Sequence, residues 1–268
     1  MTELNIAHVG GKQTMVVVYD GLVSEVLCEQ LLSVLRVDYP KGSFDGLLSA
    51  GYDPHMKVSK DLHFSAPKYQ ERELAFSMAH SELENQVHQA FSSCIAHYLS
   101  VYELQTRMFD QVNDTGFQVQ RYDRNYGYFR QHVDSFPSQG NGNRVLSIIL
   151  YLNTVEQGGE TTFPLHELAV HAVAGRVVIF PAVFTHPHEG RPPLSSEKWI
   201  INTFITNTVT KQVENLGQIQ PVEEQTEPLD KIDAPHTHFD DAFMHPHDES
   251  NHTHDAPAPK RKSREPKK

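Results

Sequence analysis

After Asp110 the apolar residues of the chain recur at every second position in a series of short runs, and this alternation constrains the fold more than any other feature. Such runs are typical of β-strands, because successive side chains of a strand point to opposite faces of its sheet. The predicted strands span residues 117–122, 128–134, 144–152, 160–163, 168–171, 176–180 and 199–206. Many short strands separated by turn residues predict a sandwich or a barrel rather than a parallel α/β sheet.

The segment before this region contains two helical patterns. A short β-branched run at residues 15–19 predicts one strand. Ser24 is suited to cap a helix in which apolar residues recur every four positions, and a longer helix is expected at about residues 71–99. Residues 41–65 show no clear period and are predicted to be irregular. The sequence therefore predicts an α+β fold, in which residues 1–110 supply a strand and helices that support a β domain at residues 111–210.

The last 58 residues have a different composition. The segment 211–268 is rich in acidic residues and proline, contains only two aromatic residues, and ends in the basic run KRKSREPKK. Such a segment buries too little apolar surface to offset its ordering entropy, so we expect a disordered tail. Three H-x-H pairs lie in it: His236/His238, His245/His247 and His252/His254. They are either part of a solvated extension or weak ligands for divalent metals.

Composition argues against several classes of protein. No run approaches 18 apolar residues, so we expect no membrane-spanning helix and no membrane partner. The first residues lack the pattern of a secretory signal, and the only two cysteines exclude a disulfide framework, so a cytoplasmic protein is expected. A net charge of −11 argues against nucleic acid as a partner. The sequence leaves the oligomeric state open.

A candidate metal site lies within the predicted strands. His132 and Asp134 are two positions apart in a strand-like segment, where both side chains are able to face one ion. His186 or His188, after a later strand, offers a third ligand. Two histidines and one carboxylate form the facial triad of non-haem Fe(II) oxygenases, whereas structural zinc sites usually use cysteine.

Residues 117–206 resemble the 2-oxoglutarate/Fe(II)-dependent dioxygenase superfamily, in particular its prolyl 4-hydroxylase-like branch. The resemblance rests on Tyr122, the H-x-D pair His132/Asp134, the run Tyr151-Leu152-Asn153, the GGETTFP run at residues 158–164, Gly175 with Phe180, and His188 followed by Lys198. It implies a double-stranded β-helix, or jelly roll, with iron at its mouth.

The resemblance also implies roles for individual residues. His132, Asp134 and His188 would be the catalytic metal ligands, because Lys198 stands ten residues after His188, as in the family pattern. His186 is then expected near the ligands or at the surface. Lys198 would pair with the far carboxylate of 2-oxoglutarate, Tyr122 and Tyr151 would place hydroxyl groups near this cosubstrate, and Thr161 is a weaker candidate.

The activity implied is that of a dioxygenase dependent on Fe(II), 2-oxoglutarate and O2, with ascorbate as a further cofactor. Such an enzyme hydroxylates a substrate C–H bond and releases succinate and CO2, and peptidyl proline is the expected substrate. Two alternatives remain open: a hydroxylase of a free amino acid or small metabolite, and a non-catalytic metal-binding β-barrel protein. The expected partner is therefore a peptide, a protein or a small molecule.

Overall fold

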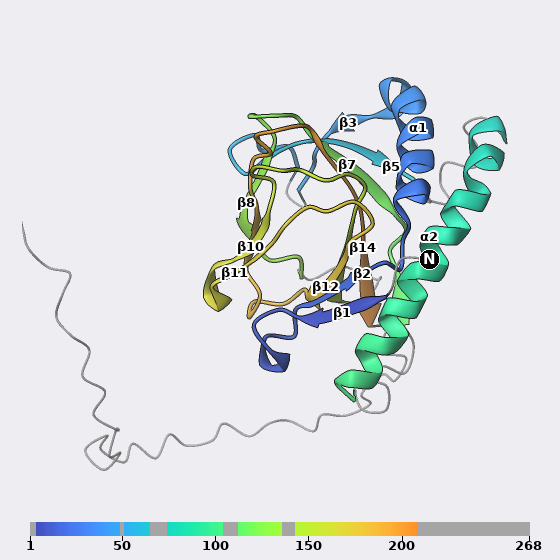
Figure 1. The fold of residues 1–268 in the computed structure, drawn as a ribbon. Helices are drawn as coiled ribbons and strands as arrows, with labels where there is room; N and C mark the ends of the chain where they lie inside the picture. Colours follow the sequence, from blue (N-terminus) through green and yellow to red (C-terminus); the bar gives the residue numbers. More distant parts are fainter. Residues whose placement is uncertain (1–3, 49–50, 65–73, 104–111, 136–142, 208–268) are drawn as a thin grey trace, which may run out of the picture. The chain divides into compact units, whose positions relative to one another are not determined.

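The computed structural model describes residues 4–48, 51–64, 74–103, 112–135 and 143–207, and it places them in two antiparallel sheets and two long helices (Figure 1). The chain divides into two compact units, residues 1–214 and 215–268. The predicted disordered tail at 211–268, with its H-x-H pairs, lies outside the described residues.

The larger sheet has nine strands. In spatial order they are β1 (Asn5–His8), β2 (Val17–Asp20), β12 (Val177–Pro181), β9 (Asn143–Tyr151), β14 (Lys198–Asn207), β7 (Gln118–Tyr122), β5 (Lys60–His63) and β3 (Phe44–Asp45), and β6 (Val112–Asp114) also pairs with β14. Because β2 pairs with β12 and β5 pairs with β7, strands from both sides of residue 110 share this sheet.

The smaller sheet has five strands and faces the larger one. Its order is β11 (Leu168–Val170), β10 (Thr161–Phe163), β13 (His188–Gly190), β8 (Tyr128–His132) and β4 (Lys57–Val58). Two short 3-10 turns, Lys12–Thr14 and Pro164–His166, lie in the connections. These two antiparallel sheets form the double-stranded β-helix that the resemblance implied, so the expected fold class is confirmed.

The alternation along the strands arises because the larger sheet is buried on both faces. On β12, Val177 and Ile179 belong to the cluster that contacts the helices, whereas Val178 and Phe180 belong to a second cluster shared with the smaller sheet. On β14, Ile201 likewise belongs to the cluster that contacts the helices, and Ile200 belongs to the second cluster. Each strand thus places alternate side chains in two cores, which positions the polar residues of the barrel interior between apolar walls.

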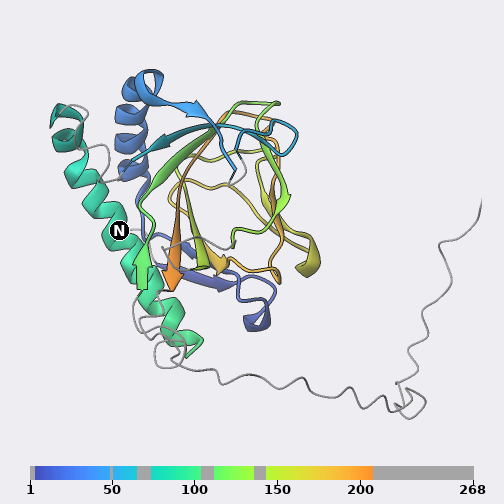
Figure 2. The ribbon, with the colours of Figure 1, turned by 180° about the vertical axis from the view of Figure 1, so that it is seen from behind.

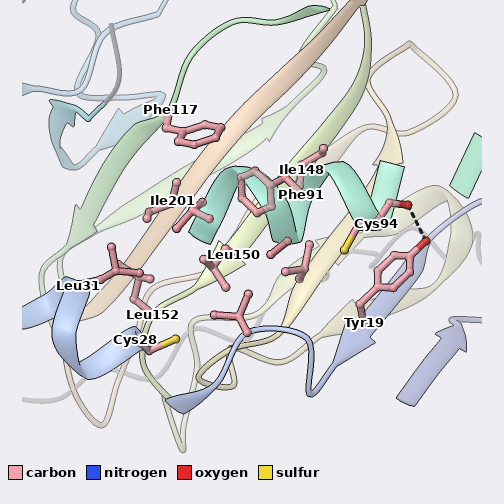
Figure 3. Packing of buried hydrophobic residues seen from close by; sticks show 14 of the residues in the cluster. Tyr19, Cys28, Leu31, Phe91, Cys94, Phe117, Ile148, Leu150, Leu152 and Ile201 are labelled. Carbon is pink, nitrogen blue, oxygen red and sulfur yellow. Dashed lines mark hydrogen bonds between the residues drawn. The ribbon is translucent and has the colours of Figure 1, made fainter. Parts of the chain in front are cut away.

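The helices α1 (Glu25–Gly42) and α2 (Leu74–Val101) lie on the same side of the barrel, as both ribbon views show (Figures 1 and 2). Helix α1 begins where predicted, since the Ser24 hydroxyl accepts a hydrogen bond from the Leu27 N–H at 3.1 Å. Leu31 from α1 and Phe91 from α2 pack with Ile148 and Ile201 of the sheet (Figure 3). Within the described residues, neither helix has the length and apolar character needed to cross a membrane.

The prediction of irregular structure for residues 41–65 is wrong for part of that segment. Helix α1 extends to Gly42, and the strands β3, β4 and β5 follow it. These strands are short, and two of their buried side chains, Lys57 and Asp61, are charged. A pattern of apolar residues therefore does not reveal them. The strands β1, β6 and β13, of three or four residues each, were also not predicted.

Candidate metal centre

The structure brings His132, Asp134 and His188 together at the ends of two paired strands of the smaller sheet. His132 is the last residue of β8, His188 is the first residue of β13, and the two are direct partners in the antiparallel register. Asp134 follows the end of β8, so the predicted strand 128–134 is two residues too long. Asp134 Oδ1 lies 3.4 Å from His132 Nε2, and its Oδ2 lies 3.3 Å from His188 Nε2. The ligand atoms of the three side chains lie within 4.8 Å of one another.

Both imidazole rings are oriented by hydrogen bonds on their far side. His132 Nδ1 is 2.8 Å from the carbonyl oxygen of Arg130, and His188 Nδ1 is 3.0 Å from that of His186. A carbonyl oxygen only accepts, so each Nδ1 carries the hydrogen and each Nε2 lone pair is directed toward the other ligands. This arrangement of ring orientation and tautomer is the one usually found for histidines that bind a metal through Nε2.

Asp134 is fixed by contacts from the larger sheet. Ser147, on β9, donates a hydrogen bond of 2.6 Å to Asp134 Oδ2, and the Asp134 backbone N–H donates to the carbonyl oxygen of Ala182 at 3.1 Å. The ring of Phe129 stacks on His132 with centroids 3.4 Å apart. Neighbouring strands therefore hold the three side chains before any ion is bound.

The charges of the cluster suit a divalent cation. Burial acts to raise the pKa of Asp134, but the adjacent His188 and His132 outweigh it and hold the pKa well below its usual range. Burial lowers the pKa of His132. Burial also acts to lower the pKa of His188, but the Asp134 carboxylate reverses this effect and raises it. The cluster thus combines one buried carboxylate with two imidazoles, and a bound divalent cation would balance the charge of that carboxylate.

His186, the alternative ligand from the sequence, faces away from this cluster. Its Nε2 lies 2.7 Å from the carbonyl oxygen of Thr14, and its Nδ1 lies 2.9 Å from the hydroxyl of Thr185. The side chain is buried and connects the loop before β13 to the turn before β2. Both of its nitrogen atoms therefore have partners in the protein, which supports His188 as the third ligand.

Replacing His186 with alanine is expected to lower stability and to leave metal binding intact. A buried hydrogen bond contributes about 0.5–1.5 kcal/mol, and the unpaired carbonyl adds a desolvation penalty of about 1–3 kcal/mol. Thermal unfolding and equilibrium dialysis with Fe(II) or Ni(II) would measure the two effects separately. Loss of the metal in His186→Ala, with binding retained in His188→Ala, would reverse the ligand assignment.

Lys198 begins β14 and is buried deep in the same cavity, with only 2% of its surface exposed. Its Nζ donates a hydrogen bond of 3.0 Å to the carbonyl oxygen of Gly159 and lies 4.6 Å from the centre of the Tyr122 ring. Burial lowers the pKa of Lys198 to about 8, although the charge of Glu160 opposes this shift. A buried cation with one neutral hydrogen-bond acceptor is suited to bind an anionic ligand.

The two tyrosines singled out from the sequence differ in position. Tyr122 lines the cavity with the triad and Lys198, and its hydroxyl donates a hydrogen bond of 2.6 Å to Gln120. Tyr151 is completely buried and donates its hydroxyl hydrogen to Thr161 Oγ1 at 2.7 Å. Thr161 is among the residues that line the cavity, and Tyr151 lies behind it. Thr161 is thus better placed than Tyr151 for contact with a ligand.

Sequence reasoning missed several residues of this cavity. The further lining residues include Gln120, Phe129, Ser147, Ile149, Asn202 and Phe204. They lie on β7, β8, β9 and β14, and each has a side chain directed to the barrel interior. The alternation of apolar residues predicted these strands. It does not distinguish a polar side chain that lines the cavity from one that faces solvent. Ser147 is the clearest case, since only its contact with Asp134 identifies it.

The family model of the 2OG-Fe(II) oxygenase superfamily matches residues 117–206, which is the segment that carries the sequence resemblance. A putative prolyl 4-hydroxylase of Acanthamoeba polyphaga mimivirus is 34% identical over 114 residues, which cover 36% of this chain and 46% of that protein. Prolyl 4-hydroxylase 5 of Arabidopsis thaliana is 36% identical over 67 residues, which cover 23% of this chain and 22% of that protein. The chain spans less than half the length of the curated relatives that it matches. The resemblance to this superfamily is confirmed over the matched segment.

Two solved structures share the fold. The viral collagen prolyl hydroxylase of Paramecium Bursaria Chlorella virus-1, determined as a 2OG complex, superposes with a TM-score of 0.54 at 18% identity, covering 74% of this chain and 98% of that chain. A prolyl hydroxylase from Trichoplax adhaerens, in complex with a hypoxia inducible factor peptide fragment, superposes with a TM-score of 0.55 at 16% identity, covering 73% of this chain and 85% of that chain. These similarities establish the double-stranded β-helix.

Proposed function

We propose that this chain, whose residues 117–206 match the 2OG-Fe(II) oxygenase superfamily, is an Fe(II)- and 2-oxoglutarate-dependent dioxygenase that hydroxylates peptidyl proline. The observation that carries the proposal is one cavity that contains both a His-Asp-His cluster and a buried lysine. A protein that only binds metal has no use for a buried cation beside the ligands. This feature therefore favours catalysis over the non-catalytic alternative.

The donor set fits ferrous iron. Two imidazole Nε2 atoms and one carboxylate form a facial triad, which leaves positions open for a chelating cosubstrate and dioxygen. When bound, iron supplies the oxidative decarboxylation of 2-oxoglutarate to succinate and CO2, coupled to insertion of the second oxygen atom of O2 into a substrate C–H bond. Thiolates, which would favour zinc, do not occur in the cluster.

The protein side chains bind and orient the cosubstrate. Lys198 would pair with the distal carboxylate of 2-oxoglutarate, since it is buried and is the one lysine or arginine among the described residues that line the cavity. Thr161, on β10, and Tyr122, on β7, also line this cavity and offer hydroxyl groups to it. The rings of Phe163 and Phe180 pack against His188 with centroid distances of 5.8 and 4.7 Å, so they exclude water from that ligand. A charge pair in such an enclosed site is stronger than in water.

Peptidyl proline is the preferred substrate because the curated relatives are named prolyl 4-hydroxylases and one structural neighbour is described with a peptide bound. A free amino acid or a small metabolite is the alternative. We also propose that ascorbate serves as a reductant for the iron. The buried free thiols of Cys28 and Cys94 are consistent with a reducing compartment such as the cytoplasm.

The substrate class is tested by incubating the protein with Fe(II), 2-oxoglutarate and ascorbate together with proline-containing peptides, matched peptides with alanine in place of proline, or free amino acids. We expect a mass increase of about 16 Da only in the proline peptides, because hydroxylation adds one oxygen atom. Products formed only from free amino acids would support the alternative substrate class.

A further inference from the structure

A buried ion pair lies beside the cavity, in the segment that sequence analysis predicted to be irregular. Lys57 Nζ is 2.7 Å from Asp61 Oδ2, and the side chains of the two residues are 2% and 0% exposed. Ser59 donates a hydrogen bond of 2.7 Å to the other oxygen of Asp61. The desolvation of both charges offsets most of their attraction, so stability alone is a poor explanation for such a pair.

The ion pair connects the two sheets next to the candidate metal centre. Lys57 is on β4, which pairs with β8 of the smaller sheet, and Asp61 is on β5, which pairs with β7 of the larger sheet. Lys57 Nζ also lies 5.2 Å from the centre of the Phe129 ring, which stacks on the ligand His132. The pair is therefore in contact with the walls of the site.

Three residues on β7 continue from Asp61 into the cavity. Gln118 Nε2 donates to Asp61 Oδ2 at 3.2 Å, Gln120 Nε2 donates to Gln118 Oε1 at 3.2 Å, and the Tyr122 hydroxyl donates to Gln120 Oε1 at 2.6 Å. These residues are two positions apart, so they share one face of the strand. We call the set Asp61, Gln118, Gln120 and Tyr122 the β7 relay.

The ionised carboxylate determines the direction of every bond in the β7 relay. A carboxylate only accepts hydrogen bonds, so Gln118 must turn its amino group toward Asp61 and its carbonyl oxygen toward Gln120. Gln120 must then present its own carbonyl oxygen to Tyr122. The hydroxyl hydrogen of Tyr122 is thereby directed along the strand, and the ring is held 4.6 Å from Lys198 Nζ.

We propose that Asp61, charge-balanced by Lys57, is a positioning residue that fixes Tyr122 in the cosubstrate pocket through the β7 relay. This inference rests on the proposed function, because it identifies 2-oxoglutarate as the ligand of that pocket. The relay sets the orientation of Tyr122 before the cosubstrate binds, which reduces the ordering cost of binding. Its effect should be on 2-oxoglutarate affinity and not on metal affinity.

The test is a double-mutant cycle with two variants. Gln118→Met interrupts the β7 relay without changing the Lys57–Asp61 ion pair, and Tyr122→Phe removes the hydroxyl group at the end of the relay. Calorimetric titration of 2-oxoglutarate into the Ni(II)-loaded protein gives its affinity without turnover, and titration of Ni(II) alone gives the metal affinity. We expect each single variant to bind 2-oxoglutarate on the order of tenfold more weakly, and the double variant to be no weaker than either. Ni(II) affinity should stay at the wild-type value throughout.

The neighbouring ion pair Lys60–Asp45 provides a matched control. It joins β5 to β3 at 2.6 Å, but its side chains are 44% and 55% exposed. Lys60→Ala should leave both affinities unchanged, since exposed pairs contribute little and adjacent residues of a strand, such as Lys60 and Asp61, point their side chains to opposite faces. A second variant that interrupts the relay, Gln120→Met, should show the same loss of 2-oxoglutarate affinity as Gln118→Met. Agreement between the two variants would show that the loss does not come from unfolding of one of them.

The outcomes separate this inference from the function on which it rests. Unchanged 2-oxoglutarate affinity in a folded Gln118→Met protein, or additive losses in the double variant, would overturn the relay and leave the proposed function standing. Wild-type protein that binds Ni(II) but no 2-oxoglutarate would overturn both.

Discussion

Replacing Asp134 with alanine is expected to abolish both tight iron binding and turnover of 2-oxoglutarate. The two remaining imidazoles are monodentate ligands, and the anion that balances the charge of the metal is lost. Asp134 also joins the other two ligands in the structure, at 3.4 Å from His132 and 3.3 Å from His188. Iron content after reconstitution, measured beside succinate production, reports the two losses separately.

Two further variants make this expectation specific. Ser147→Ala removes the hydroxyl that donates to Asp134 at 2.6 Å, and a change of this kind typically lowers metal affinity or activity by about 10- to 100-fold. Asp123→Ala removes an exposed carboxylate that pairs with Arg121 at 3.0 Å and should change neither quantity. Full iron binding by Asp134→Ala would mean that the ion is held elsewhere.

Replacing Lys198 with alanine should raise the KM for 2-oxoglutarate steeply while iron content stays at the wild-type value. A hydrogen bond to a charged group contributes about 1.5–3 kcal/mol, which corresponds to about 10- to 150-fold in affinity. The loss is expected at the upper end, because the unpaired carboxylate would remain buried. Lys198→Arg should recover part of it, since arginine keeps the charge but needs more room. An unchanged KM for 2-oxoglutarate in Lys198→Ala would show that Lys198 does not bind the cosubstrate.

The pH dependence of 2-oxoglutarate binding gives an independent test of Lys198. Burial lowers the pKa of this lysine to about 8 in the free protein, and an anionic ligand favours the protonated form. Below pH 8 the charge is already present, so affinity should be constant in that range. Above pH 8 binding must take up a proton, and affinity should fall by up to about tenfold per pH unit. Lys198→Arg, which stays charged, should show no such decrease.

The spacing of motifs singled out three side chains that the structure brings together, because they lie at or just beyond the ends of two paired β-strands. His132 and Asp134 are two positions apart, and the choice of His188 over His186 followed from the position of Lys198. The contacts in the structure support that choice, since His186 is bonded to Thr14 and Thr185, whereas His188 has its Nε2 directed to Asp134.

Polar residues with buried side chains could not be found in the same way. Lys57 and Asp61 look like solvated charges in a sequence, and their burial depends on strands that are brought together from distant segments. The same holds for Gln118 and Gln120, which face the interior only because β7 pairs with β5 and β14. Apolar periodicity identifies which residues form the core, but contacts between polar groups require the tertiary structure.

The most direct test of the central claim is succinate release by the purified protein when iron is removed and then restored. We predict no succinate from 2-oxoglutarate in the metal-free protein, rapid release after addition of Fe(II) in the presence of O2 and a proline-containing peptide, and one hydroxylated peptide for each succinate formed. Iron bound at His132, Asp134 and His188 with no succinate released under these conditions would contradict the assignment of this cavity as a 2-oxoglutarate-dependent active site.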